Sequence, residues 1–338
     1  MTVSKQTAPP SPPGREVIDR HAFAIYLPMA MLAGMKLDVF TPLKDGPLSA
    51  EALAEAVGVD SVRLSQLLYA LVVAELLEVS DSLFANTAVS DHYLVRGRQS
   101  YIGDLHELYS RLWGVLPRTA ESIRLAAPQA KQDFALGSEK ELRAFFRQQQ
   151  SGAMAAGKLL ADTFDLKRFQ NLLDVAGGGG GFSIAACQAC PNLSSTVVDL
   201  PSVIPITREL VNEAGLADRI KAVPTDVCDH PPEGLFDVAI LRNFIQVISS
   251  VQARRALLNV SQALEPGGAI IIWGRVLDDS RLTPVESVVQ NLIFLNQYDE
   301  GQSYTEREYR DWLAEAGFVD IQRSQQPGGG SVVSARKS

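Results

Sequence analysis

A run of five glycines is the segment of this 338-residue sequence with the clearest chemical potential. Residues 172–183 read LLDVAGGGGGFS, in which an apolar strand ends at Val175 and an apolar helix is expected over 182–190. Glycines at such a turn permit positive φ and let a ligand approach the backbone closely. In nucleotide-binding folds a turn of this kind carries the cofactor at a helix N-terminus. A flexible connection without a ligand is the alternative interpretation.

Two carboxylates follow the glycine run at informative positions. A second predicted strand ends in Asp199, 25 residues after Asp174. A carboxylate there can accept both hydroxyls of a ribose. Asp226 follows the third predicted strand, where an adenine would lie, although a simple turn aspartate is the alternative. Together these residues indicate a nucleotide-containing cofactor.

The elements that would position these residues alternate between strand and helix after Asp165. Strands are predicted at 171–175, 195–199, 220–223, 236–242 and 269–275, with helices between most of them. This alternation predicts a parallel sheet covered by helices on both faces. The chain then ends in a predicted helix, 305–316, and two short strands around Val319 and Val332.

The N-terminal third is predicted to be helical. Helices are expected at 18–40, 49–57 and 61–73, the last two capped by Ser49 and Ser61, and a β-hairpin is expected at 76–87. This order is typical of a winged helix, a shape that often binds DNA. Residues 44–98, however, contain four basic and eight acidic side chains, which would repel a phosphate backbone. A protein–protein role is the better prediction, and residues 101–164 are expected to form connecting helices.

Composition excludes several classes of protein. The net charge of −8 argues against a nucleic-acid partner, and no apolar run reaches the roughly 18 residues of a membrane span. Residues 1–14 are rich in Pro, Ser and Thr, and we expect a disordered tail. With three cysteines and no export signal, we expect a cytoplasmic protein with reduced thiols. Cys187 and Cys190 have no partner pair nearby, so we expect packed thiols and no metal.

The order of motifs resembles one enzyme family. DVAGGGGGFS, VVDLPSVI, TDVCD, FDVAILRNFIQ and LEPGGAIIIWGRVLDD are similar to the second family of S-adenosylmethionine (SAM)-dependent O-methyltransferases, which includes plant caffeate-type and bacterial secondary-metabolism enzymes. The resemblance covers nearly all of the chain after the tail. It implies a Rossmann-like α/β class I methyltransferase domain at 166–338 with a mostly parallel seven-stranded sheet. It also implies a mostly helical winged-helix dimerisation domain at 15–115, connecting helices at 116–165 that line the substrate pocket, and a homodimer acting on a small molecule.

The resemblance also implies which residues bind SAM. Gly178 and Gly180 would line its methionine and ribose parts, and Asp199 would hold the ribose hydroxyls. Ala176 departs from the family, which usually has glycine there. The residues expected at the cofactor are Asp174, Gly177, Gly178, Gly180, Asp199, Leu200, Asp226, Val227 and Arg242.

The family's catalytic base is missing from this sequence. Members that methylate hydroxyls usually carry a histidine four residues after the position of Arg242, where this chain has Gln246, and the positions of its acidic partners align with Gly274 and Ser303. A phenol of pKa ~10 is mostly protonated at neutral pH, and losing a general base costs a factor on the order of 10²–10⁴. A thioether sulfur carries no proton and needs no base, so proximity and desolvation suffice.

We therefore expect S-methylation of a thioether acid. The missing base and N-terminal half are similar to bacterial enzymes that S-methylate 4-methylthio-2-hydroxybutyrate on the route to dimethylsulfoniopropionate. One alternative is O- or N-methylation of a pre-ionised substrate, or of one activated by an unrecognised tyrosine or histidine. Others are a SAM-binding protein that transfers no methyl and a winged-helix regulator.

Polar and aromatic side chains are needed to hold such a substrate, and an exposed helix face is the alternative for each polar candidate. The four histidines at 21, 92, 106 and 230 are expected to be structural or solvated. The catalytic candidates are Gln246, Tyr109 and Tyr298. The substrate-binding candidates are Arg147, Gln148, Gln149, Gln246, Phe294 and Tyr298.

Overall fold

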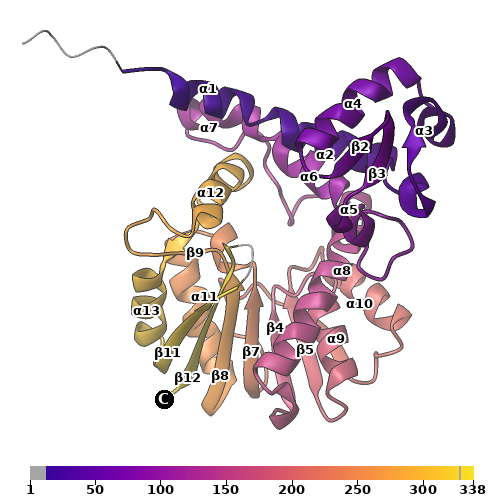
Figure 1. Ribbon diagram of the computed structural model, residues 1–338. Coiled ribbons are helices and arrows are strands. Elements are labelled where there is room, and N and C mark those ends of the chain that lie inside the picture. The colour runs from indigo at the N-terminus through magenta and orange to yellow at the C-terminus, as the bar shows by residue number, and fades with distance from the viewer. Residues whose placement is uncertain (1–12, 327–328) are drawn as a thin grey trace, which may run out of the picture. The chain divides into compact units, whose positions relative to one another are not determined.

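A computed structural model describes residues 13–326 and 329–338. Residues 1–12 of the predicted disordered tail lie outside the described residues. The chain divides into two compact units, Met1–Gly114 and Val115–Ser338 (Figure 1).

The first unit is mostly helical and carries a small sheet. Its helices are α1 (Glu16–Phe23), α2 (Tyr26–Leu37), η1 (Pro42–Asp45), α3 (Ala50–Val57), α4 (Ser61–Val73), α5 (Ala88–Tyr93) and α6 (Leu105–Gly114). Its strands are β1 (Leu48–Ser49), β2 (Leu77–Ser80) and β3 (Leu83–Asn86), in the antiparallel order β1-β3-β2. The predicted hairpin is therefore confirmed, with β1 as an unforeseen third strand.

Two details of the first unit differ from the sequence predictions. The single helix expected over 18–40 is broken after Phe23, and α2 ends at Leu37 because Asp38, with a φ of 55°, does not continue the helix. Ser49 does cap α3, but α4 is capped by Asp60 rather than Ser61, because the Asp60 carboxylate accepts the Arg63 backbone N–H at 2.8 Å. Aspartate is as good a cap as serine, so the sequence allowed either.

The second unit is built on a seven-stranded sheet of order β11-β12-β8-β7-β4-β5-β6. The strands are β4 (Asn171–Val175), β5 (Ser194–Asp199), β6 (Ile220–Pro224), β7 (Phe236–Arg242), β8 (Leu264–Gly274), β11 (Phe318–Gln325) and β12 (Ser331–Lys337). All neighbours pair in parallel except β12, which runs antiparallel to β8 and β11. A separate parallel pair joins β9 (Val276–Leu277) to β10 (Tyr304–Thr305). The predicted parallel sheet is confirmed, with strand ends within a few residues except at the start of β8.

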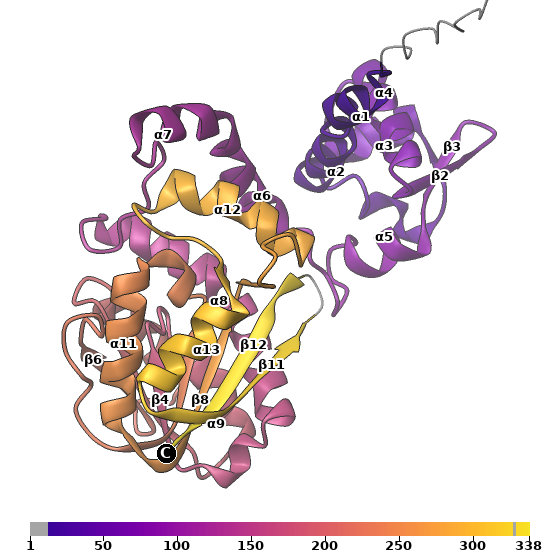
Figure 2. The same cartoon turned by 90° about the vertical axis from the view of Figure 1, so that its left-hand side faces the viewer.

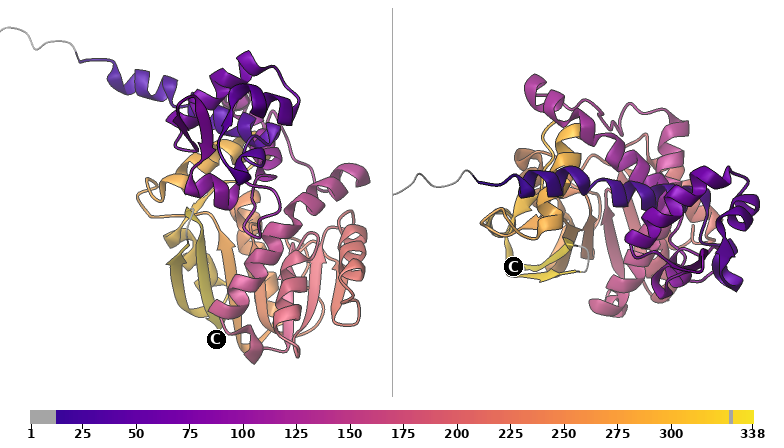
Figure 3. Two further views of the ribbon diagram at one scale, coloured as in Figure 1. Left: turned by 45° about the vertical axis from the view of Figure 1, so that its right-hand side comes forward. Right: turned by 45° about the horizontal axis from the view of Figure 1, so that its top comes forward.

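Helices cover both faces of this sheet, as predicted. Helices α8 (Glu139–Thr163), α9 (Gly181–Ala189) and α10 (Ile204–Glu213) pack on one apolar core, and α11 (Ser250–Ala263) and α13 (Glu306–Glu315) on another. Figure 2 shows α11 and α13 over one face, and Figure 3 shows the long α8 crossing the sheet. The remaining helices are η2 (Leu116–Arg118), α7 (Thr119–Leu125), η3 (Leu166–Arg168), η4 (Ile245–Val247) and α12 (Val285–Gln297).

Among the described residues, no single helix is long and apolar enough to cross a membrane. Helices α3 and α4 meet the length and composition criteria only when taken together, across a bend of 108°. Their buried leucines belong to the core of the first unit.

Candidate active site

The glycine run forms the turn between β4 and α9. Gly178 (φ 56°) and Gly180 (φ 72°) adopt left-handed backbone conformations, which glycine reaches without steric cost. A Cβ on Gly177 would lie 2.7 Å from Val197 Cγ1 and 2.8 Å from Asp174 Cγ. Only glycine therefore lets the turn pack this closely against the ends of β4 and β5.

Helix α8 covers the glycine turn. A Cβ on Gly178 would lie 2.6 Å from Phe146 Cε1, and one on Gly179 would lie 2.8 Å from Gln150 Oε1. Neither Phe146 nor Gln150 was predicted from the sequence. Their spacing with the buried Leu142, four residues apart along one helix face, was the available signal.

Asp199 lies at the carboxyl end of β5, directly beside the glycine turn. Its Oδ2 accepts the Gly178 backbone N–H at 2.8 Å, and its Oδ1 accepts the Leu200 backbone N–H at 2.7 Å. Burial raises the pKa of Asp199 to about 6, and the two backbone N–H bonds oppose that rise. A carboxylate oxygen has more than one acceptor site, so both oxygens can still accept a hydroxyl.

Asp174, on β4, connects the elements on both sides of the glycine turn. Its carboxylate is buried and accepts the Ser183 hydroxyl at 2.6 Å, and Ser183 in turn contacts the Ser195 hydroxyl at 2.8 Å. Burial raises the pKa of Asp174 to about 6, and Arg242 favours its charged form. Burial also lowers the pKa of Arg242. Asp174 thus joins β4, α9 and β5, with the arginine at the end of β7 close by.

The predicted adenine-side residues follow β6. Asp226 Oδ1 accepts the Cys228 backbone N–H at 2.9 Å, and its charge contributes to the raised pKa of Asp199. The buried Val227 has its carbonyl held by Asn259 Nδ2 at 2.9 Å. Residues from three consecutive parallel strands therefore meet at one edge of the sheet, which is where ligands bind in doubly wound folds.

Gln246 occupies the predicted base position, in η4 just after β7. Its side chain is buried, and its Oε1 accepts the Arg275 backbone N–H at 2.7 Å. Its Nε2 points to Asn243 Oδ1 at 3.4 Å, a long and weak contact. A Cβ on Gly274 would lie 2.5 Å from Gln246 Oε1. The amide therefore fills the space in which an acidic partner at position 274 would lie.

Ser303 is the second position aligned with an acidic partner, and its side chain is hydrogen-bonded within the core. It is fully buried, and its hydroxyl donates to the Ser287 carbonyl at 3.1 Å. Neither 274 nor 303 can orient a base, and an amide side chain does not titrate in the physiological range.

Tyr298 and Phe294 lie at the end of α12, with ring centroids 6.2 Å apart. A Cβ on Gly301 would lie 2.9 Å from both Tyr298 Cβ and the Gln246 carbonyl oxygen. The loop after α12 thus brings Tyr298 close to Gln246, two candidates that are 52 positions apart in the sequence.

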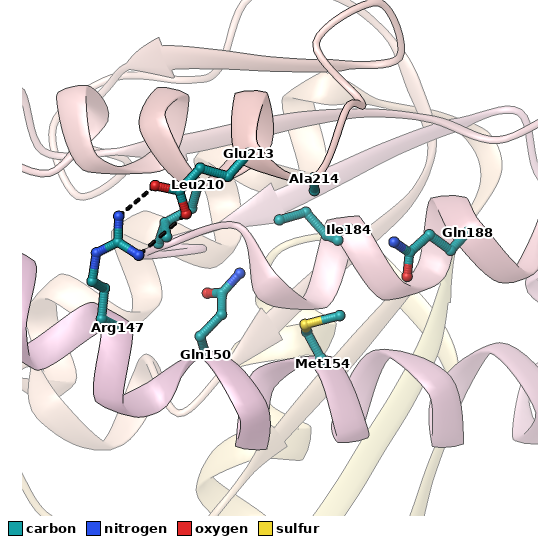
Figure 4. A pocket seen from close by; sticks show the side chains of 8 residues that line it. All are labelled: Arg147, Gln150, Met154, Ile184, Gln188, Leu210, Glu213 and Ala214. Atoms are coloured by element: carbon teal, nitrogen blue, oxygen red, sulfur yellow. Dashed lines mark hydrogen bonds and ion pairs between the residues drawn. The ribbon is translucent and has the colours of Figure 1, made fainter.

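The Arg147 side chain extends from α8 to α10. Its guanidinium pairs with Glu209 and Glu213 of α10 at 2.5 Å each. Figure 4 shows it at the rim of a pocket of about 370 Å³ between α8, α9 and α10. The pocket is lined by Arg147, Gln150, Met154, Ile184, Gln188, Leu210, Glu213 and Ala214. These ion pairs favour the helix-surface alternative for Arg147 over substrate binding.

The remaining candidates lie on α8 and in the first unit. Gln148 and Gln149 are half-buried on α8. Tyr109 belongs to the first unit, where it packs on the core and stacks on Trp113 with centroids 5.1 Å apart. Within the described residues no group of three or more His, Cys, Asp or Glu side chains could hold a metal ion, and the three cysteines are buried and free.

Two protein-family models match this chain. Residues 130–319, more than half of the chain, match the O-methyltransferase domain family. The chain belongs to this family. Residues 19–96 match the dimerisation domain that accompanies it. The protein is therefore a SAM-dependent methyltransferase with an N-terminal dimerisation domain, as the motifs predicted.

Similar proteins are spread over bacteria and animals. The methyltransferase is 30% identical over 327 residues to the 3-hydroxy-5-methyl-1-naphthoate 3-O-methyltransferase of Streptomyces sahachiroi, covering 94% of each chain. It is 27% identical to the tetracenomycin polyketide synthesis 8-O-methyl transferase TcmO of Streptomyces glaucescens, covering 93% and 94%. The structure of human N-acetylserotonin methyltransferase in complex with SAM has the same fold, with a TM-score of 0.78, 24% identity and complete coverage of both chains.

The site fits SAM as its cofactor. Gly178 and Gly180 give the turn before α9 its left-handed backbone, and a glycine turn at a helix N-terminus is where doubly wound folds bind a nucleotide-containing cofactor. The Asp199 carboxylate is held rigidly at the strand end by two backbone N–H groups, where ribose hydroxyls would reach it. Asp226 and Val227 lie beyond it, where an adenine would follow.

Proposed function

We propose that this methyltransferase transfers a methyl group to a hydroxyl oxygen of a small molecule, and that the acceptor loses its proton without help from a protein base. The observation that carries this proposal is Gln246, whose amide stands at the base position and fills the space beside Gly274. The matched family and the two Streptomyces relatives are named for O-methyl transfer, so hydroxyl methylation, weighed second from the sequence, is better supported than methylation of a thioether.

Bound SAM supplies an activated methyl group on a sulfonium. The acceptor oxygen forms its bond to that methyl carbon while the carbon–sulfur bond breaks and the electron pair stays on sulfur. The Gln246 amide can orient the acceptor, but it cannot remove the acceptor's proton. The reactive form must therefore be an oxygen already ionised at the working pH, such as that of an acidic phenol or an enol.

An acceptor panel tests this proposal. The purified enzyme would be incubated with SAM carrying a labelled methyl group and with acidic phenols, ordinary phenols, amines and thioether acids. We expect turnover on acidic phenols and a fall on the order of 10²–10⁴ on phenols of pKa ~10. Transfer to amines or thioethers alone would contradict it.

S-methylation of a thioether acid such as 4-methylthio-2-hydroxybutyrate is the second candidate, because the same amide at position 246 suits an acceptor that has no proton. The two candidates differ in pH dependence. A thioether reaction has no ascending limb from acceptor ionisation, whereas a phenol reaction rises with pH until the acceptor is ionised.

We also propose that the enzyme works as a homodimer through its first unit. None of the eight described residues of α1 is buried, and α1 and α2 carry exposed large apolar side chains, among them Ile18 (71% exposed), Phe23 (66%) and Tyr26 (63%). Exposed apolar clusters of this kind mark protein–protein contacts. The match of residues 19–96 to the dimerisation domain supports the same conclusion.

A further inference from the structure

A buried hydroxyl lies beneath Gln246. Tyr309, on α13, is completely buried, and its hydroxyl has no hydrogen-bond partner among the described residues. An unpaired buried hydroxyl costs free energy, and phenylalanine would fill the same space without that cost. A nearby hydrogen-bond acceptor for this hydroxyl would therefore be stabilising.

Gln246 Oε1 is an acceptor near this hydroxyl. A Cβ on Gly274 would lie 2.5 Å from Gln246 Oε1 and 3.9 Å from the Tyr309 hydroxyl, so both atoms lie beside one point. Glycine at position 274 leaves that space to the Gln246 amide. The two atoms do not hydrogen-bond in this structure, so a side chain must move for Oε1 to accept from Tyr309.

The orientation of the Gln246 amide is set by its partners. The Arg275 backbone N–H can only donate, so Oε1 and not Nε2 must face it. A tyrosine hydroxyl on the same side reinforces this orientation. Nε2 then faces the opposite way, where Asn243 Oδ1 at 3.4 Å is a weak acceptor for one of its two N–H bonds.

We propose that Gln246 is an amide donor that selects an anionic acceptor oxygen, and that Tyr309 is the positioning residue that keeps this donor directed outward. This inference rests on the proposed function and deepens it by naming the acceptor class, a phenolate or enolate. A hydrogen bond donated to the charged form favours ionisation, so the site lowers the pKa of the bound acceptor in place of removing its proton with a base. The acceptor proton goes to solvent before methyl transfer.

Spectroscopic titration of a bound phenol tests the inference without turnover. 4-Nitrocatechol, whose ionised form is yellow, would be titrated on the enzyme loaded with S-adenosylhomocysteine. We expect wild type to shift the probe's ionisation to lower pH by about one unit, which is tenfold in the ionisation constant. Gln246→Glu keeps an oxygen for the Arg275 N–H but replaces the donor with a carboxylate, which disfavours an anionic probe, so it should abolish the shift. Tyr309→Phe should reduce the shift without lowering the urea denaturation midpoint.

Tyr304→Phe is the matched control. Tyr304 is equally buried in the same cluster, but its hydroxyl donates to the Ile248 carbonyl at 2.7 Å. Its loss should lower the denaturation midpoint and leave the probe's shift intact. Equal titration in wild type and Gln246→Glu, or no binding of the probe by wild type, would overturn the inference. The proposed function is tested by a separate experiment, methyl transfer to the acceptor panel, so either proposal can fail while the other stands.

Discussion

At the scale of single residues, the ionisation of Asp199 should control cofactor binding. Burial raises its pKa from the ordinary 3.8 to about 6. Protonation removes acceptor sites for the ribose hydroxyls, so affinity for S-adenosylhomocysteine should be constant above pH 7 and fall as pH drops through 6. Isothermal titration calorimetry from pH 5 to 8 measures this, and Asp199→Asn should bind weakly at every pH.

Asp237→Asn provides the control for that titration. Asp237 accepts the Gln170 and Asn171 backbone N–H groups near the amino end of β4, far along the strand from the glycine turn. The variant should keep the same fall in affinity below pH 6. A wild-type affinity that does not change between pH 5 and 8 would contradict the role given to Asp199.

The same raised pKa values have a consequence for stability. Asp174 and Asp199 both have pKa values of about 6 in the folded chain, above the 3.8 of an unfolded aspartate. Between about pH 4 and 6 the folded state binds more protons than the unfolded state. The contribution of these two groups to stability therefore increases as pH falls through that window.

Residues at strand ends could be predicted from sequence, whereas residues that act across elements could not. Asp199 and Asp226 follow apolar strands, and parallel strand ends meet at one edge, so their proximity followed from the pattern. Phe146 and Tyr309 matter through contacts with segments distant in sequence, which no local pattern reports. Ala176 illustrates a middle case: the motif expects glycine there, and the alanine indeed adopts a φ of 51°.

At the scale of elements, the close packing of α8 on α9 should depend on one glycine. A Cβ on Gly157 would lie 2.5 Å from the Phe182 carbonyl oxygen and 3.0 Å from Ala185 Cβ. Gly157→Ala should therefore lower the free energy of unfolding by about 1–3 kcal/mol through overpacking. Urea denaturation followed by circular dichroism measures it.

Gly152 supplies the matched substitution in the same helix. It is exposed, and the nearest atom to a Cβ there is Arg242 Nη2 at 3.9 Å. Gly152→Ala should stabilise the fold by about 0.5–1 kcal/mol, because alanine is the better helix former. If both variants were equally stable, the contact between α8 and α9 would not have the closeness described.

Elements with a strong hydrophobic periodicity were the part of the fold that could be predicted from the sequence. The strands β4 and β7 begin and end at the predicted residues. The break between α1 and α2 was missed, because the apolar spacing continues through Ala24 and Ile25 and Pro28 was interpreted as only a mild interruption. Pro28 in fact lies in the first turn of α2, the position at which a helix tolerates proline. Arg147 was ambiguous for a related reason: the period of α8 does not say which neighbour each polar position meets, and α10 supplies its two glutamates.

At the scale of the whole molecule, the exposed apolar side chains of α1 and α2 should hold two copies together. Replacing Phe23 and Tyr26 with glutamate should halve the molar mass measured by light scattering after size-exclusion chromatography, because charges oppose burial at such a contact. Val251→Glu, at a residue of α11 that is 65% exposed, should leave the mass unchanged. A double variant with the wild-type molar mass would show that these residues do not lie in the interface.

The dependence of kcat on pH for two hydroxyl acceptors is the measurement that tests base-free methyl transfer most directly. The acceptors should differ in hydroxyl pKa by about two units. We predict an ascending limb whose midpoint moves with the acceptor by about the same amount, because only the acceptor ionises. A limb fixed near pH 6.5 for both acceptors would reveal a protein base and contradict the role assigned to Gln246.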